Sequence, residues 1–298
     1  MNVNLIGVPI NYGCDKEGAQ YGPTKLRENN IVEVMKRGGH QIYDLGDIDV
    51  PFICQEDKYA CHEKMKYLSP IAEINTNLAH EVYCSLSGKS FPFVIGGDHA
   101  LGLGSIAGCS KYFKEIAVIW VDAHGDINSY ETSPSGNIHG MPLAASMGIG
   151  HPILTNVYFE GTKVKPENVY IVGARDLDQG EIELAKKLNL NLYTIDIVKN
   201  RGLENVIIEI INKIKDSNVN GVHLSFDIDV LDKSIVPGTG TAVDNGFNVE
   251  EGKFLFDKFL GEGFITSMDF VELNPKLDVD DRTTKVCIEM IDHIFKTI

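Results

Sequence analysis

Short apolar runs alternate with segments of helical character along the whole chain, and this alternation constrains the fold more than any other feature. Runs typical of buried strands cover residues 3–8, 41–45, 91–95, 116–121, 168–172, 192–195, 221–226 and 264–270. Helix-end signals and apolar spacing predict helices at 23–36, 70–86, 102–110, 180–188, 203–214, 249–260 and 281–295. Strand–helix–strand repeats of this kind predict a mostly parallel sheet of about eight strands, with helices on both faces.

Size and charge narrow the class of protein. No linker rich in Pro, Gly or Ser divides the 298 residues and no repeat is visible, so we expect residues 1–298 to form a single domain. The 27 basic and 42 acidic residues give a net charge of −15, which argues against nucleic acid and favours cationic substrates or metal ions.

Cysteine spacing and the first residues indicate the cellular compartment. The six cysteines form no CxxC pair, which is typical of reduced thiols in a cytosolic protein. The start of the chain lacks a basic region followed by a long apolar one, and no run is long and apolar enough to cross a membrane. We therefore expect a cytoplasmic protein without a membrane partner.

Acidic residues and histidines gather where three of the predicted strands end. Two short motifs, DAHGD and DID, and a third, GGDH, follow or end apolar runs. Side chains two residues apart point the same way in extended backbone, and the carboxyl edge of a parallel sheet is where sites form. We therefore expect six side chains to converge: His99, Asp122, His124, Asp126, Asp227 and Asp229.

Four carboxylates beside two imidazoles form a plausible site for two divalent cations. The set is too rich in oxygen for structural zinc and too rich in nitrogen for calcium, so manganese or another octahedral first-row ion fits best. Two such ions ~3.5–4 Å apart can lower the pKa of a shared water to near neutrality. Residue types alone leave phosphoester, amide and other C–N hydrolysis open.

Seven motifs occur in the order found in the ureohydrolase family, which comprises arginases and agmatinases: GGDHALGLGS, DAHGDIN, SGNIHG, GARDLD, SFDIDVLD, GTGT and VELNP. The chain resembles the arginases of this family nearly end to end. The resemblance implies an α/β fold, namely a three-layer α/β/α sandwich with an eight-stranded mostly parallel sheet. It also implies two Mn²⁺ per chain, cleavage of L-arginine to L-ornithine and urea, and a homo-oligomer, either a trimer or a hexamer.

The resemblance assigns the metal ligands by position. One manganese would be held by His99, Asp122, Asp126 and Asp227. The other would be held by His124, Asp122, Asp227 and Asp229. Asp122 and Asp227 would bridge the two ions, and a metal-bridging hydroxide would attack the guanidinium carbon.

Asp126 and residues of three later motifs are expected to take part in catalysis or to support it. Asp126 is placed to accept and pass on a proton, and His139 in SGNIHG is expected to carry one to the leaving amine. Glu272 in VELNP follows an apolar run and could pair with the guanidinium group. Thr241, with Thr239 in the same GTGT loop, is expected to support Glu272 or the metal ligands.

Substrate choice is expected to depend on loop residues. Asn128, Ser135 and Asn137 resemble arginase residues that bind the α-carboxylate, and Asp178 resembles an acid near the α-ammonium, to which Glu181 could add. A site built for these two groups would reject agmatine, which lacks the carboxylate and the α-ammonium, because its polar atoms would stay unpaired.

Some positions depart from the arginase pattern. Val230 and Lys233 stand where arginases commonly have Gly and Pro, which makes DIDVLD look more like an agmatinase, and Asn245 alters the loop after GTGT. Agmatinase, or another ureohydrolase acting on a guanidino or formimino compound, is therefore the alternative. A metal-binding protein without activity and a two-metal phosphoesterase are more distant alternatives, the latter because no Arg or Lys cluster accompanies the motifs.

Overall fold

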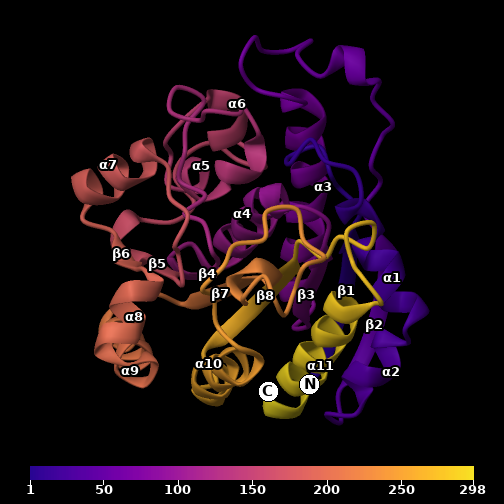
Figure 1. The fold of residues 1–298 in the computed structure, drawn as a ribbon, viewed down its shortest axis with the longest axis vertical. Helices are drawn as coiled ribbons and strands as arrows, with labels where there is room; N and C mark the ends of the chain where they lie inside the picture. The colour runs from indigo at the N-terminus through magenta and orange to yellow at the C-terminus, as the bar shows by residue number, and fades with distance from the viewer.

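The structure, a computed structural model, describes residues 1–298. Its centre is one sheet in which every neighbouring pair of strands is parallel, in the order β2-β1-β3-β8-β7-β4-β5-β6 (Figure 1). The expected eight-stranded α/β sheet is thus confirmed. The strands are β1 (Asn2–Val8), β2 (Gln41–Asp47), β3 (Phe91–Gly96), β4 (Ile116–Val121), β5 (Val169–Val172), β6 (Asn191–Tyr193), β7 (Gly221–Asp227) and β8 (Ile265–Val271).

Helices cover both faces of the sheet. One layer packs on one face and comprises α1 (Gly22–Glu28), α2 (Ile31–Lys36), α8 (Ile195–Arg201), α9 (Leu203–Asp216), α10 (Val249–Gly261) and α11 (Arg282–Thr297). The other layer comprises α3 (Leu68–Ser87), α4 (Gly102–Phe113), α5 (Pro142–Ser146), α6 (Pro152–Thr155) and α7 (Gln179–Leu188). No helix combines the length and apolar character needed to cross a lipid bilayer.

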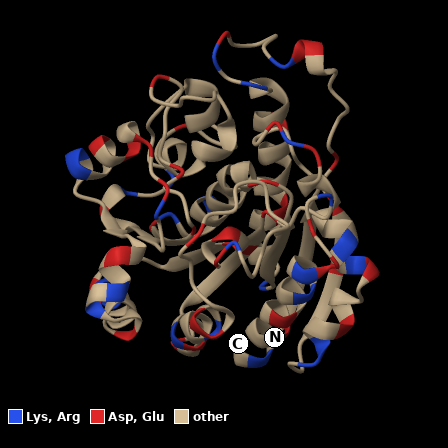
Figure 2. Ribbon diagram, viewed as in Figure 1, with Lys and Arg blue, Asp and Glu red and all other residues tan.

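Strand alternation divides the apolar core into these two layers. In β4, Ile119 and Val121 join the cluster on one face, whereas Val118 and Trp120 join the cluster on the other. All six residues of β4 are buried, as expected for a central parallel strand covered on both sides. Charged side chains lie on the helices and loops that surround the sheet (Figure 2).

The structure corrects several sequence predictions. The helix expected at 23–36 is two helices, because Asn30 adopts left-handed backbone (φ 59°) between α1 and α2. The strand expected at 192–195 ends at Tyr193, since the Thr194 hydroxyl caps α8, which begins at Ile195. The short helices α5 and α6 were not predicted; each has Pro as its first residue, but neither is long enough to show periodicity.

Candidate metal centre

Four adjacent strands at the middle of the sheet each deliver polar residues at their carboxyl ends. His99 follows β3 in a 3-10 turn, Glu272 follows β8, Asp227 ends β7 and Asp122 follows β4. In the sheet these strands lie in the order β3-β8-β7-β4, so residues far apart in sequence become neighbours.

The predicted convergence is present, but its expected cause was wrong. The backbone does not stay extended through the DAHGD motif, since β4 ends at Val121 and Asp126 adopts left-handed backbone with φ 52°. Asp229 likewise lies in a 3-10 turn, η6 (Ile228–Val230), rather than in a strand. Tight turns after the strands, not strand alternation, bring the side chains together.

The first group of side chains surrounds His99. Its Nδ1 atom lies 2.9 Å from Oδ2 of Asp122, 3.2 Å from Oδ2 of Asp126 and 3.3 Å from Oδ2 of Asp227. All four residues are at least 94% buried. Three carboxylates thus point at one imidazole nitrogen.

The second group surrounds His124 and shares a residue with the first. Nδ1 of His124 lies 3.3 Å from Oδ1 of Asp122 and 3.3 Å from Oδ2 of Asp229. The two oxygens of Asp122 therefore face different histidines. Asp227 joins only the first group, because its Oδ1 accepts a hydrogen bond from the backbone N–H of Asp229 at 2.8 Å.

The burial and charge of these groups fit bound cations. Nδ1 of His99 is buried without a hydrogen-bond partner although three carboxylate oxygens surround it. Burial and the charges of Asp229 and Asp122 raise the pKa of Asp227 well above its ordinary value. Burial and Asp122 raise the pKa of Asp126 to about 6. Cations among these oxygens would offset both the burial of the carboxylates and their mutual repulsion.

Neighbouring side chains hold the acids and His99 in place. The ring of His99 stacks on Trp120 at 3.9 Å between centroids, and its Nε2 lies 2.8 Å from Oγ of Ser225. Trp120 Nε1 donates to Oδ2 of Asp122 at 3.1 Å, and the Thr241 hydroxyl donates to Oδ2 of Asp229 at 2.9 Å. The sequence reasoning missed Trp120 and Ser225, although each lies two residues before a predicted ligand.

His139 and Glu272 lie together beside the first group. Nδ1 of His139 is 3.5 Å from Oε1 of Glu272, which also accepts the backbone N–H of His99 at 2.8 Å. Burial lowers the pKa of His139, but nearby carboxylates, Glu272 foremost, outweigh it and raise this pKa above its ordinary value. Oε2 of Glu272 is buried without a partner. Thr239 contacts neither group through its hydroxyl, which is also buried and unpartnered.

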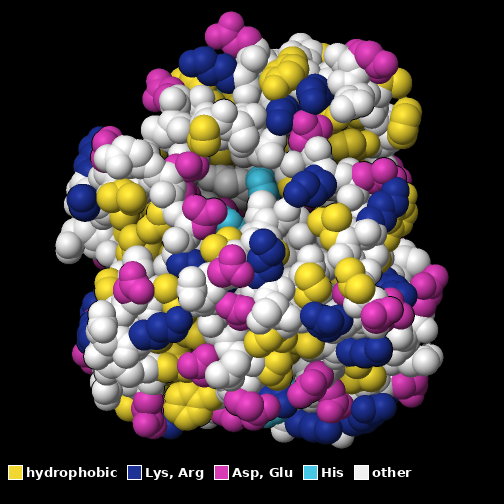
Figure 3. All heavy atoms as spheres, viewed as in Figure 1, with side chains coloured by type: hydrophobic (Ala, Val, Ile, Leu, Met, Phe, Trp, Pro, Cys, Tyr) yellow, Lys and Arg dark blue, Asp and Glu magenta, His cyan; other side chains and the backbone are white.

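A polar cavity of about 120 Å³ opens beside the two His–Asp groups. Figure 3 shows a hollow in the face it presents, bordered by acidic and histidine side chains. Every residue expected to contact substrate lines the cavity except Glu272; Ser133 and Asp176 line it too and were not predicted. The lining is His124, Asp126, Asn128, Ser133, Ser135, Asn137, His139, Gly140, Asp176, Asp178, Glu181 and Thr241.

Two of the lining acids already have protein partners. Nδ2 of Asn128 donates to Oδ2 of Asp178 at 2.8 Å. Both oxygens of Glu181 accept backbone N–H groups, from Ile127 at 3.1 Å and from Asp178 at 2.9 Å. Burial raises the pKa of Glu181 to about 7. Glu181 therefore fixes the start of α7 and the loop after β4, and leaves Asp178 as the better placed acid for a cationic ligand group.

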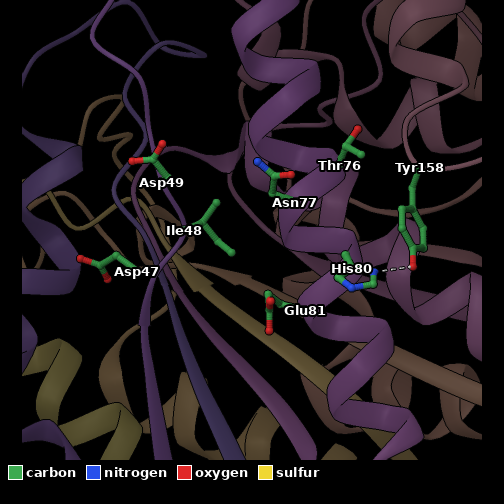
Figure 4. Close-up of a pocket in the computed structure, with 8 residues that line it drawn as sticks. All are labelled: Asp47, Ile48, Asp49, Thr76, Asn77, His80, Glu81 and Tyr158. Atoms are coloured by element: carbon green, nitrogen blue, oxygen red, sulfur yellow. Dashed lines mark hydrogen bonds between the residues drawn. The ribbon is translucent and has the colours of Figure 1, made fainter.

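A larger pocket of about 490 Å³ lies elsewhere, between the end of β2 and α3 (Figure 4). Three acids, Asp47, Asp49 and Glu81, line it, and His80 hydrogen-bonds to Tyr158 at 3.3 Å. Neither of the two groups of side chains able to hold a metal lies there. The polar cavity beside His99 and His124 is therefore the candidate site.

Together, the three-layer fold and the joined His–Asp groups at its central strand ends define a metal-dependent hydrolase of the α/β class. Comparison with known proteins specifies it further. The sequence model of the Arginase family matches residues 1–296. An arginase of Brevibacillus brevis is 42% identical over 294 residues, which are 99% of this chain and 97% of the relative. An arginase of Bacillus subtilis is 40% identical over 98% of this chain and 97% of the relative.

Solved structures give the same result. A crystal structure of arginase from Bacillus subtilis superposes with a TM-score of 0.91 and 39% identity, covering 99% of this chain and 98% of that one. The arginase of Entamoeba histolytica in complex with L-ornithine superposes with a TM-score of 0.89 and 33% identity, covering 99% and 97%. The chain belongs to the arginase family and is a hydrolase that acts on a guanidino C–N bond.

Proposed function

We propose that the protein hydrolyses L-arginine to L-ornithine and urea. The observation that carries this proposal is the polar cavity, which joins the two His–Asp groups at one end to amide, hydroxyl and carboxylate side chains at the other. Two relatives 42% and 40% identical are named arginase, which favours arginine over agmatine despite Val230 and Lys233.

We propose two Mn²⁺ as the cofactor. His99, Asp122, Asp126 and Asp227 would hold one ion, and His124, Asp122, Asp227 and Asp229 the other. Mixed imidazole and carboxylate donors suit a first-row ion of this kind. Bound ions of this class lower the pKa of water and so make a nucleophile available near neutral pH.

The chain's own residues bind and orient the substrate and move the proton. Asn128, Ser135 and Asn137 accommodate the α-carboxylate, and Asp178 faces the α-ammonium. His139, whose pKa the neighbouring carboxylates raise, donates a proton to the leaving amine, and Asp126 accepts one from the attacking water. Glu272 does not line the cavity, but its Oε2 has no protein partner, and this oxygen would pair with the guanidinium group; Thr241 holds Asp229 in place.

We also propose that residues 1–298 work as one domain in a cytoplasmic homo-oligomer. The family resemblance supports a trimer or a hexamer. Light scattering should give a mass three or six times the 32.9 kDa of one chain.

The substrate assay tests the function directly. Protein loaded with Mn²⁺ is given L-arginine, agmatine and formiminoglutamate separately. Urea should form from arginine and from neither of the others, and formiminoglutamate should release no formamide. Faster urea release from agmatine than from arginine would instead assign the protein as an agmatinase.

A further inference from the structure

A lysine outside the cavity reaches one of the residues that line it. The ammonium group of Lys66 lies 2.7 Å from Oδ1 of Asn137, and the Lys66 side chain is only 14% exposed. The backbone fixes this approach, because Lys66 N–H donates to the Gly136 carbonyl at 3.1 Å. Gly136 has φ 70°, and a Cβ there would lie 2.0 Å from the Lys64 carbonyl oxygen. The segment before α3 is therefore packed tightly against the 133–137 loop.

Lys66 settles which way the Asn137 amide faces. Its ammonium can only donate, so the atom it contacts must be the amide oxygen. Nδ2 of Asn137 then donates one hydrogen to the Cys14 carbonyl at 3.0 Å. The second Nδ2 hydrogen has no protein acceptor and remains available to an acceptor in the cavity.

Lys66 also leaves an excess of positive charge at this end of the cavity. Lys66 and Lys58 both pair with Oδ2 of Asp15, at 3.0 Å and 2.9 Å, so two cations share one carboxylate. Asp176 and Asp178 line the cavity too, and no lysine or arginine does. The surroundings of Asn137 thus provide the cationic counterpart to these acids.

We propose that Lys66 is a specificity-determining positioning residue, which makes Asn137 a carboxylate-binding group by fixing and polarising its amide. This inference rests on the proposed function, because it concerns the α-carboxylate of an amino-acid substrate. A donor polarised by an ammonium group binds an anion more strongly than a neutral amide does. Agmatine and putrescine lack the carboxylate, so their binding gains nothing from Lys66.

Two lysine variants separate this role from a structural one. Lys66→Met should raise the KM for arginine about tenfold and leave kcat within about twofold. Lys58→Met is the matched control, since it removes the other partner of Asp15 but no contact to Asn137; its KM for arginine should stay near that of the unmodified protein. A loss in kcat as large as the rise in KM would mean that Lys66 only supports the fold.

Ligand binding tests the inference without turnover. In calorimetry on the Mn²⁺-loaded protein, Lys66→Met should weaken L-ornithine about tenfold and leave putrescine unchanged. Lys66→Arg, which keeps the charge and can still donate to Oδ1, should retain ornithine affinity within about threefold. If the Lys66→Met variant folds poorly, the Lys66→Arg variant still allows ornithine binding to be measured with this position changed.

The two proposals fail in different ways. If the unmodified protein shows no preference for ornithine over putrescine, or if Lys66→Met leaves that preference intact, the role of Lys66 is refuted. If the unmodified protein releases no urea from arginine but Lys66→Met still weakens the binding of ornithine selectively, the proposed function fails. The carboxylate site then stands.

Discussion

Asp227 is a carboxylate that is buried and close to other carboxylates. It is 2% exposed, and two other acids, Asp122 and Asp229, raise its pKa together with burial. One oxygen faces His99 while the other accepts the N–H of Asp229. A side chain held in this way is costly without a cation, which makes it a sharp test of the proposed metal centre.

Replacing Asp227 should abolish most metal binding. Asp227→Ala removes a proposed ligand, so Mn²⁺ affinity should fall by about 100-fold or more, and urea release with it. Metal content after gel filtration, measured by mass spectrometry, checks this. The control, Asp257→Ala, removes an exposed acid on α10 and should leave the metal content unchanged. Retention of both ions by the Asp227 variant would contradict the ligand assignment.

The sequence predicted which acids and histidines meet, but not what holds them. The proposed ligands lie next to strand ends, where the sheet topology makes neighbours of distant residues. Contacts such as His99 to Ser225, 126 positions apart, depend on the register between strands. Lys66 and Asn137 are 71 positions apart and no strand joins them, so no local pattern indicates that pair.

At the scale of elements, the start of α7 contains a buried acid whose charge opposes folding. The pKa of Glu181 is about 7 in the fold against an ordinary value of 4.5, so the folded chain binds its proton more tightly than the unfolded chain. The contribution of Glu181 to the free energy of unfolding is therefore fully present below pH 4.5 and is lost as the pH rises through 7.

Between pH 4.5 and 7 the free energy of unfolding of the metal-free protein should fall by up to roughly 3 kcal/mol on account of Glu181. Glu181→Gln cannot ionise, so its stability should vary less over this range. Urea denaturation at several pH values measures the difference. Glu183→Gln, an exposed position on α7, should follow the unmodified protein; identical slopes for all three would contradict the pKa of Glu181.

The connection between α6 and β5 is organised around a single buried lysine. Lys163 is 4% exposed and its ammonium group donates to the carbonyls of Thr155 at 2.9 Å and Gly161 at 2.7 Å, and to that of Phe159. The same group lies 4.0 Å from the centre of the Phe159 ring. One side chain thus holds three carbonyl groups of this loop together.

Lys163→Met should lower the free energy of unfolding by about 2–4 kcal/mol, because several carbonyls lose their donor inside the protein. Denaturant unfolding measures this. Lys165→Met removes an exposed lysine that pairs with Glu115, and its effect should stay within about 0.5 kcal/mol. A similar small change at both positions would show that water replaces the ammonium group.

At the scale of the whole molecule, the order of the strands and the long helices was predictable because buried parallel strands and their covering helices differ in length and spacing. Boundaries within the loops were not. Asn30 breaks a segment with good helical spacing, and α8 begins one residue after the Thr194 cap, so strand and helix signals overlap there. Such choices depend on backbone conformation at single residues, which spacing does not encode.

Metal binding should stabilise the entire fold, because the carboxyl ends of the central strands meet at the site. At Mn²⁺ concentrations 100 times the dissociation constant, one site contributes about 2.7 kcal/mol, or a rise in Tm of roughly 5 °C. Calorimetry before and after chelation measures it. Ca²⁺ should have a smaller effect, since imidazole nitrogen suits it poorly. A Tm that does not change when Mn²⁺ is added would contradict a metal centre at this site.

The carboxyl group of Asp122 turns one oxygen to His99 and the other to His124. A single rotation about its Cβ–Cγ bond would withdraw both oxygens at once, and Trp120 Nε1 restrains that rotation. The halves of the centre are consequently not separable modules: any substitution that displaces this one planar group disturbs both halves together.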